Sequence, residues 1–158
     1  MKNLPLSTLL LGIGNDILGD DAVGLIAVRS LKDEFQNSVA IIEAMMGGLK
    51  LMELLEGYDR VLILDAIMTK KHPVGSVLEI SKELFHKTVA IAPHYVSLPE
   101  AIELAGHLGI MFPKEIRILV MEIDDPYRVT EELTPTVREA LPEFIRRARD
   151  ILHDLLKT

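Results

Sequence analysis

Residues 8–24 read TLLLGIGNDILGDDAVG, and this stretch decides the fold class. Its first part, Thr8–Ile13, is apolar on both faces, which is typical of a central strand in a parallel sheet. The glycines at positions 12, 14 and 19 predict a turn, and apolar residues at helical spacing then predict a helix over about 21–34. The stretch therefore reads as the first strand, turn and helix of an α/β domain.

The rest of the chain repeats this alternation of apolar runs and amphipathic stretches. We expect one domain over residues 1–158, a three-layer α/β/α fold with a mostly parallel, twisted sheet. Pro142 lies inside the last predicted helix and should kink or break it. The expected strands lie at 39–44, 60–64, 76–80 and 116–123, and the expected helices at 49–55, about 97–108 and from Thr134-Pro135 onward.

Composition excludes several classes of function. The chain has no cysteine, so disulfides, thiolate nucleophiles and cysteine metal ligands are absent. Its net charge of −7 disfavours a nucleic-acid partner, because phosphate binding needs a basic face. No apolar run reaches the roughly 18 residues of a membrane span, and no small-residue cleavage site follows the apolar stretch after Lys2. We expect a cytoplasmic protein with no membrane or nucleic-acid partner.

The turn after the first strand is not a dinucleotide-binding loop. The G-x-G-x-x-G pattern would need glycine at position 17, where Ile17 stands. Asp20 and Asp21 would also meet the pyrophosphate at the start of the helix, where an anion needs donors rather than carboxylates. These two aspartates have a simple structural interpretation as well, as caps that offset the helix dipole.

Two more polar residues follow apolar segments. Asp65 comes directly after the run 61–64, at the expected carboxyl end of a strand, where open α/β sheets bind their ligands. His94 lies in the segment IAPHY, between apolar residues and the next helix. Singly, Asp65 can be a solvated strand-end residue and His94 a structural histidine. Together with Asp21, they form an oxygen, oxygen, nitrogen set that suits zinc or nickel.

Four motifs carry a resemblance to a known family. They are Gly12-Ile13-Gly14-Asn15 with Asp20-Asp21 and Gly24; Ile63-Leu64-Asp65-Ala66 with Pro73-Val74-Gly75; Pro93-His94 before a helix; and Leu133-Thr134-Pro135-Thr136-Val137 before the last helix. Their order and spacing over nearly the whole chain resemble those of the [NiFe]-hydrogenase maturation endopeptidases.

The resemblance implies a function and a site. It implies an endopeptidase that removes the C-terminal extension of a nickel-loaded hydrogenase large-subunit precursor, which is then its partner. Asp21, Asp65 and His94 correspond to the residues that contact nickel, and Asp21 and Asp65 are the candidate catalytic bases. The nickel is recognised in the substrate rather than held tightly by the free enzyme, and we expect a monomer. No HExxH motif of the zincin proteases occurs.

One segment departs from the family pattern. Where members commonly have an acidic residue, two glycines and a threonine, this chain has Met46-Gly47-Gly48-Leu49, and Glu43 supplies an acid only with a three-residue shift. Met46 can simply pack in the core. The reaction type stays open between an aspartic-type and a metal-assisted mechanism. Two alternative functions are a non-catalytic, nickel-dependent module that checks the precursor and a nucleoside-phosphorylase-like enzyme, which lacks a basic phosphate cluster here.

Overall fold

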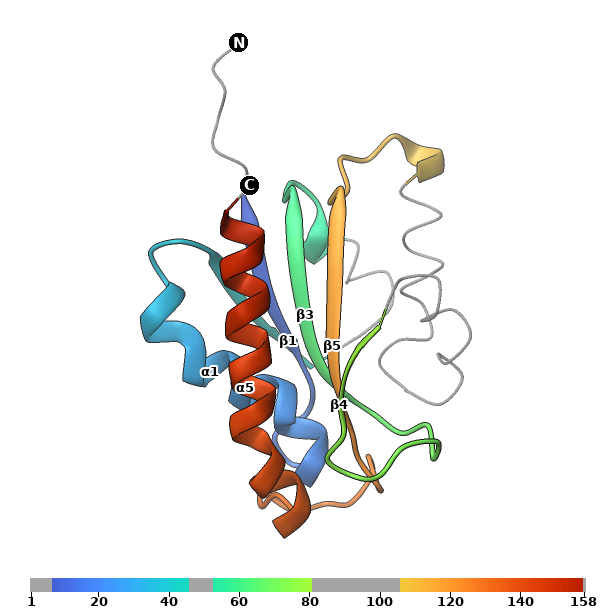
Figure 1. The fold of residues 1–158 in the computed structure, drawn as a ribbon. Helices are drawn as coiled ribbons and strands as arrows, with labels where there is room; N and C mark the ends of the chain where they lie inside the picture. Colours follow the sequence, from blue (N-terminus) through green and yellow to red (C-terminus); the bar gives the residue numbers. More distant parts are fainter. Residues whose placement is uncertain (1–6, 46–52, 81–105, 158) are drawn as a thin grey trace.

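The computed structural model describes residues 7–45, 53–80 and 106–157. Within these residues the chain forms a five-stranded sheet in the order β2-β1-β3-β5-β4 (Figure 1). The first four of these strands pair in parallel, and β4 is antiparallel to β5. This confirms the predicted mostly parallel α/β sheet. The strands are β1 (Thr8–Ile13), β2 (Ala40–Ala44), β3 (Arg60–Ile67), β4 (Val77–Ile80) and β5 (Glu115–Glu122).

The centre of the sheet is buried on both faces. Every residue of β1 is buried, as is every residue of β3 after Arg60, which explains the unbroken apolar runs 9–13 and 61–64. Alternate side chains of β3 point to opposite faces, so Leu62 and Leu64 belong to one hydrophobic cluster and Val61 and Ile63 to the other.

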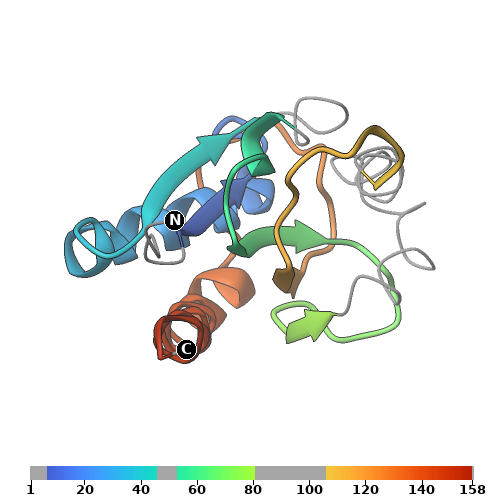
Figure 2. The same ribbon diagram turned by 90° about the horizontal axis from the view of Figure 1, so that it is seen from above.

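Two helices cover one face of the sheet. A 3₁₀ turn, η1 (Gly19–Ala22), leads into α1 (Val23–Phe35), and α5 (Pro135–Leu156) packs beside α1 (Figures 1 and 2). The opposite face is packed, among the described residues, by four side chains. These are Leu54, Leu55, Tyr58 and Phe112. Residues 53–55 and 106–108 are helical, and the rest of the two predicted helices at 49–55 and 97–108 lies outside the described residues.

Of the kink or break predicted at Pro142, the break does not occur. The helix α5 continues from Pro135 to Leu156 with Pro142 inside it. Buried side chains lie on both sides of the proline, Val137 before it and Phe144 after it. Packing of this apolar face against the sheet and α1 therefore outweighs the one backbone hydrogen bond that a proline cannot donate.

Two predicted boundaries were also wrong. The first helix begins as a 3₁₀ turn, so Asp21 lies in η1 and α1 itself begins at Val23. The strand β3 continues past residue 64 to Ile67, because Asp65, Ala66 and Ile67 keep their pairing with β5. A polar residue inside an apolar run predicts the end of a strand, but pairing with the neighbouring strand continues β3 through Asp65.

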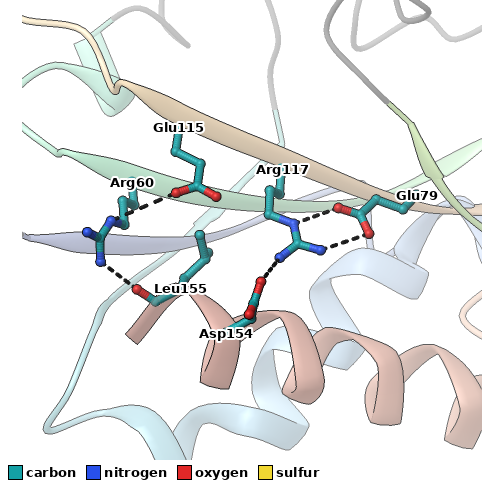
Figure 3. Close-up of polar contacts among 6 residues, drawn as sticks. All are labelled: Arg60, Glu79, Glu115, Arg117, Asp154 and Leu155. Carbon is teal, nitrogen blue, oxygen red and sulfur yellow. Dashed lines mark hydrogen bonds and ion pairs between the residues drawn. The ribbon is translucent and has the colours of Figure 1, made fainter. Parts of the chain in front are cut away.

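Arginines fix α5 to the sheet at the end away from the η1 turn. Arg117 of β5 contacts Glu79 of β4 through two nitrogens, at 2.6 and 3.0 Å, and Asp154 of α5 at 2.6 Å (Figure 3). The guanidinium of Arg60 donates to the carbonyl oxygen of Leu155 in the last turn of α5, where a cation complements the helix dipole. Among the described residues, no helix has the length and apolar character that crossing a membrane requires.

Candidate active site

Glycines bring the first turn into direct contact with the sheet. A Cβ on Gly24 would lie 2.3 Å from the carbonyl oxygen of Leu64 and 2.8 Å from that of Ile13, so the start of α1 touches the backbone of β3 and β1. A Cβ on Gly14 would lie 2.3 Å from the carbonyl oxygen of Asp21. Only glycine fits at these two approaches, which place η1 at the carboxyl end of the parallel strands.

Asp21 is buried in this turn, with 1% of its surface exposed. Residues of η1 approach residues of β3 within 8 Å, Cα to Cα. The turn that carries Asp21 therefore lies against β3 near the carboxyl end of the parallel strands, the end at which α/β folds bind ligands. Asp21 does not occupy the N-cap position of α1, which Ala22 holds, but it does lie with Asp20 in the first turn of η1.

Asp65 is buried completely, at 0% exposure. It lies in β3 opposite Val120 of β5. The pairing of β3 with β1 ends one residue earlier, at Leu64 and Gly12. Its Oδ1 accepts a hydrogen bond of 2.7 Å from the backbone N–H of Ala66. The interpretation of Asp65 as a solvated strand-end residue is therefore wrong.

Burial of two carboxylates at one end of a sheet is chemically unusual. Removing an ionised carboxylate from water is costly, and such groups gather at functional sites more often than elsewhere. Asp65 comes from β3, and Asp21 comes from η1, the turn that precedes α1 and approaches β3. This arrangement can position a water molecule or bind a cation, which are the two roles that the sequence predicted.

The third predicted ligand, His94, lies outside the described residues, as do Met46 and Leu49. Within residues 7–45, 53–80 and 106–157, no group of three histidine, aspartate or glutamate side chains is placed to hold a metal ion. The nickel-contacting set of Asp21, Asp65 and His94 therefore stays a prediction. Of the described histidines, His72 is exposed, and His153 packs its ring 5.2 Å from that of Phe35.

The position of Asp20 predicts a cap of its own helix, but the side chain binds another segment instead. Its carboxylate accepts hydrogen bonds from the backbone N–H and the hydroxyl of Thr134, each 2.8 Å long. The backbone joins the same two segments, because Gly19 donates to the carbonyl of Thr130 at 2.8 Å and Thr130 donates to that of Ile17 at 2.9 Å. The turn after β1 is thus anchored to the residues that precede α5.

Arg29 braces the other side of this turn. Its guanidinium contacts both carboxylate oxygens of Asp16, at 2.9 and 2.8 Å, and Glu43 of β2 at 2.9 Å. Hydrogen bonds from Arg29 hold the pKa of Asp16 below its usual value, and those to Asp16 and Glu43 raise the pKa of Arg29. Glu43, the acid considered for the departing loop, is thus engaged in bracing the turn.

Sequence reasoning missed one buried acid, Glu122. This residue ends β5 with 1% exposure. Its carboxylate accepts hydrogen bonds from the N–H of Thr69 at 2.7 Å, the hydroxyl of Thr69 and the N–H of Lys70 at 3.2 Å. The sequence feature that could have revealed this residue is a single acid near the end of the apolar run 116–123. Glu122 fixes the position of the chain just after β3.

Known proteins resemble this chain in sequence. The family model for hydrogenase maturation proteases matches residues 26–151. The chain is 33% identical over 141 residues to the hydrogenase 2 maturation protease of Escherichia coli K12, covering 85% of this chain and 83% of that protein. It is 30% identical over 148 residues to the hydrogenase expression/formation protein HupD of Bradyrhizobium diazoefficiens, covering 91% and 77%.

Solved structures of hydrogenase maturation proteases have the same fold as this chain. The hydrogenase maturating endopeptidase HybD from Escherichia coli superposes with a TM-score of 0.78 at 25% identity, covering 94% of this chain and 93% of that one. The [NiFe] hydrogenase maturation protease HybD from Thermococcus kodakarensis shares the fold, with a TM-score of 0.72 at 22% identity over 92% of this chain and 99% of that one. The chain belongs to the hydrogenase maturation protease family.

Proposed function

We propose that this protease removes the C-terminal extension of a [NiFe]-hydrogenase large-subunit precursor after nickel has been inserted. The observation that carries the proposal is the burial of Asp21 and Asp65 on two elements that meet at the carboxyl end of the sheet. Membership of the hydrogenase maturation proteases supports the substrate class. A protease site built from carboxylates also fits a chain without cysteine.

The buried carboxylates supply the base. A carboxylate shielded from bulk water can hold one water molecule, take its proton and direct its oxygen at the scissile carbonyl carbon. Asp65 sits on a rigid strand and Asp21 on a turn fixed by Gly14 and Gly24, so both positions are set before the substrate arrives. Nickel bound in the precursor would polarise the neighbouring carbonyl as a Lewis acid.

The nickel arrives with the substrate in this proposal. Two carboxylates and one histidine bind nickel more weakly than a site made of thiolates, because softer and more basic ligands hold such metals better. The protease is therefore largely metal-free by itself. The metal in the precursor then acts as the recognition element, with His94 as the nitrogen ligand, and His94 must be neutral to bind it.

A cleavage assay tests the proposal. Nickel-loaded precursor is incubated with the wild-type protein and with Asp65→Asn, and its mass is followed. Wild type is expected to shorten the precursor at its C-terminus, while Asp65→Asn leaves it intact. His94→Ala should also be inactive. Stable binding of the precursor by wild type without any mass change would instead support a non-catalytic checking module.

A further inference from the structure

Glu122 holds the chain segment that follows β3 in one conformation. Its carboxylate accepts hydrogen bonds from the backbone N–H and hydroxyl of Thr69 and from the backbone N–H of Lys70. The backbone N–H of Lys71 donates to the hydroxyl oxygen of Thr69 at 3.1 Å. The backbone of Glu122 secures the far end, accepting from Gly75 and donating to Ser76, both at 2.8 Å. One buried residue thus fixes both ends of the segment 69–76.

This anchoring sustains an uncommon backbone conformation. Lys70 has a φ of 60°, and among the described residues no other residue except glycine has a positive φ. A side chain is disfavoured there, so the surrounding structure must impose the conformation. Lys70 and Lys71 are both exposed, and neither takes part in an ion pair within the described part of the chain. The segment therefore presents two exposed ammonium groups, unpaired within the described residues, from a fixed backbone.

The charge of this lysine pair contrasts with its setting. The chain carries 24 acidic and 17 basic residues. The candidate active site contributes the buried carboxylates of Asp21 and Asp65, and a cavity of about 120 Å³ beside Asp20 is lined by four acidic side chains and one arginine. Figure 1 shows the segment between β3 and β4 at the same end of the sheet as the start of α1 and the start of α5. An anionic ligand that approaches this end is repelled by the acidic side chains around Asp20 and attracted by the lysine pair.

We propose that Lys70 and Lys71 bind the α-carboxylate at the end of the extension that the protease removes. This inference rests on the proposed function, because a C-terminal extension always ends in a carboxylate, whatever its sequence. An ammonium pair held on a fixed backbone binds such a group without first ordering the loop. The segment begins just after the end of β3, the strand that carries Asp65, so the lysine pair lies at the same end of the sheet as the candidate catalytic carboxylates.

The test combines enzyme variants with a change to the substrate. The substrate is nickel-loaded precursor whose extension ends either in the free acid or in an amide, prepared by ligating a synthetic peptide. The enzymes are wild type, the double variant Lys70→Gln/Lys71→Gln and the matched control Lys114→Gln/Lys157→Gln, whose lysines lie at the opposite end of the sheet. KM and kcat are measured for each pair.

For wild type, amidation should raise KM roughly three- to tenfold with little change in kcat, the size expected of exposed charge pairs. The Lys70/Lys71 double variant should show the raised KM with both substrates, while the control behaves as wild type. Equal KM values for free acid and amide with wild type would overturn the inference, even if the double variant binds more weakly. If wild type cleaves neither substrate, the proposed function itself fails.

Discussion

Asp20 and Thr134 form one structural unit, although they lie far apart in the chain. Both oxygens of the Asp20 carboxylate accept from Thr134, one from its N–H and one from its hydroxyl, each at 2.8 Å. Thr134 is the N-cap residue of α5, and Asp20 lies in η1 beside Asp21. The contact therefore couples the turn that carries a candidate catalytic residue to the start of the last helix.

Loss of this contact should destabilise the fold more than it affects chemistry. Asp20→Ala removes two hydrogen bonds to a buried carboxylate and should cost about 1.5–3 kcal/mol of unfolding free energy. Thr134→Val removes only the hydroxyl bond and should cost about 1 kcal/mol. Urea unfolding of both single variants and the double variant gives the coupling between them, which should exceed about 0.5 kcal/mol. Strictly additive effects would show that the two side chains do not interact.

Asp21→Asn and Asp65→Asn should separate activity from folding. Asparagine keeps the size of the side chain and, at position 65, an oxygen that can accept from the N–H of Ala66. Each change removes a buried negative charge, so unfolding free energy should stay within about 1 kcal/mol of wild type while processing is lost. Circular dichroism and a precursor mass assay measure the two effects. A variant that processes precursor at the wild-type rate would remove that aspartate from the catalytic machinery.

Gly24→Ala should damage the site through the backbone. The added methyl group meets the carbonyl oxygens of Leu64 and Ile13, so α1 must move away from the strands at a cost of roughly 1–3 kcal/mol or more. Gly106→Ala is the matched control, since a Cβ there meets nothing within 4 Å, and its effect should stay within about 1 kcal/mol. Thermal unfolding compares the two. Equal melting temperatures would contradict the close approach of α1 to β3.

The pairing of Asp16 with Arg29 should appear as a pH effect. The pKa of Asp16 is lowered in the folded protein, chiefly by the hydrogen bonds from Arg29. Its contribution to stability is therefore complete above the unfolded pKa, about 3.9, and is lost as the pH falls through the lower folded pKa. Arg29→Met should move the Asp16 pKa, followed by NMR, back toward the unfolded value. An unchanged pKa would show that Arg29 does not hold this carboxylate in solution.

The sequence predicted the elements well where hydrophobic pattern alone determines them. The bounds of β1 agree with the predicted 8–13, since an apolar run between a polar residue and a glycine turn leaves no ambiguity. The end of β3 was missed because pairing with β5, a tertiary contact, carries the strand through Asp65. The sequence predicted a kink or a break at Pro142, and the break does not occur, because packing on both sides of the proline sustains α5.

Some features of the candidate site could be predicted from the sequence, and others depend on tertiary contacts. Asp21 and Asp65 could be named from their positions after apolar strands, but their burial could not, because it depends on how Gly24 packs α1 onto β3. The partner of Asp20 could not be found either, since a local motif predicts a local cap and the real partner is Thr134. Glu122 is visible in the sequence as an acid within an apolar strand, but its role depends on the loop whose N–H groups bind it, which the sequence does not show.

One measurement tests the central claim most directly. The purified protease is incubated in parallel with nickel-loaded precursor and with the same precursor prepared without nickel, and the C-terminus of each is identified by mass spectrometry. The account predicts that the nickel-loaded precursor alone loses its extension, at a single peptide bond. Equal cleavage of the nickel-free precursor, or nickel bound tightly by the protease before it meets any substrate, would contradict it.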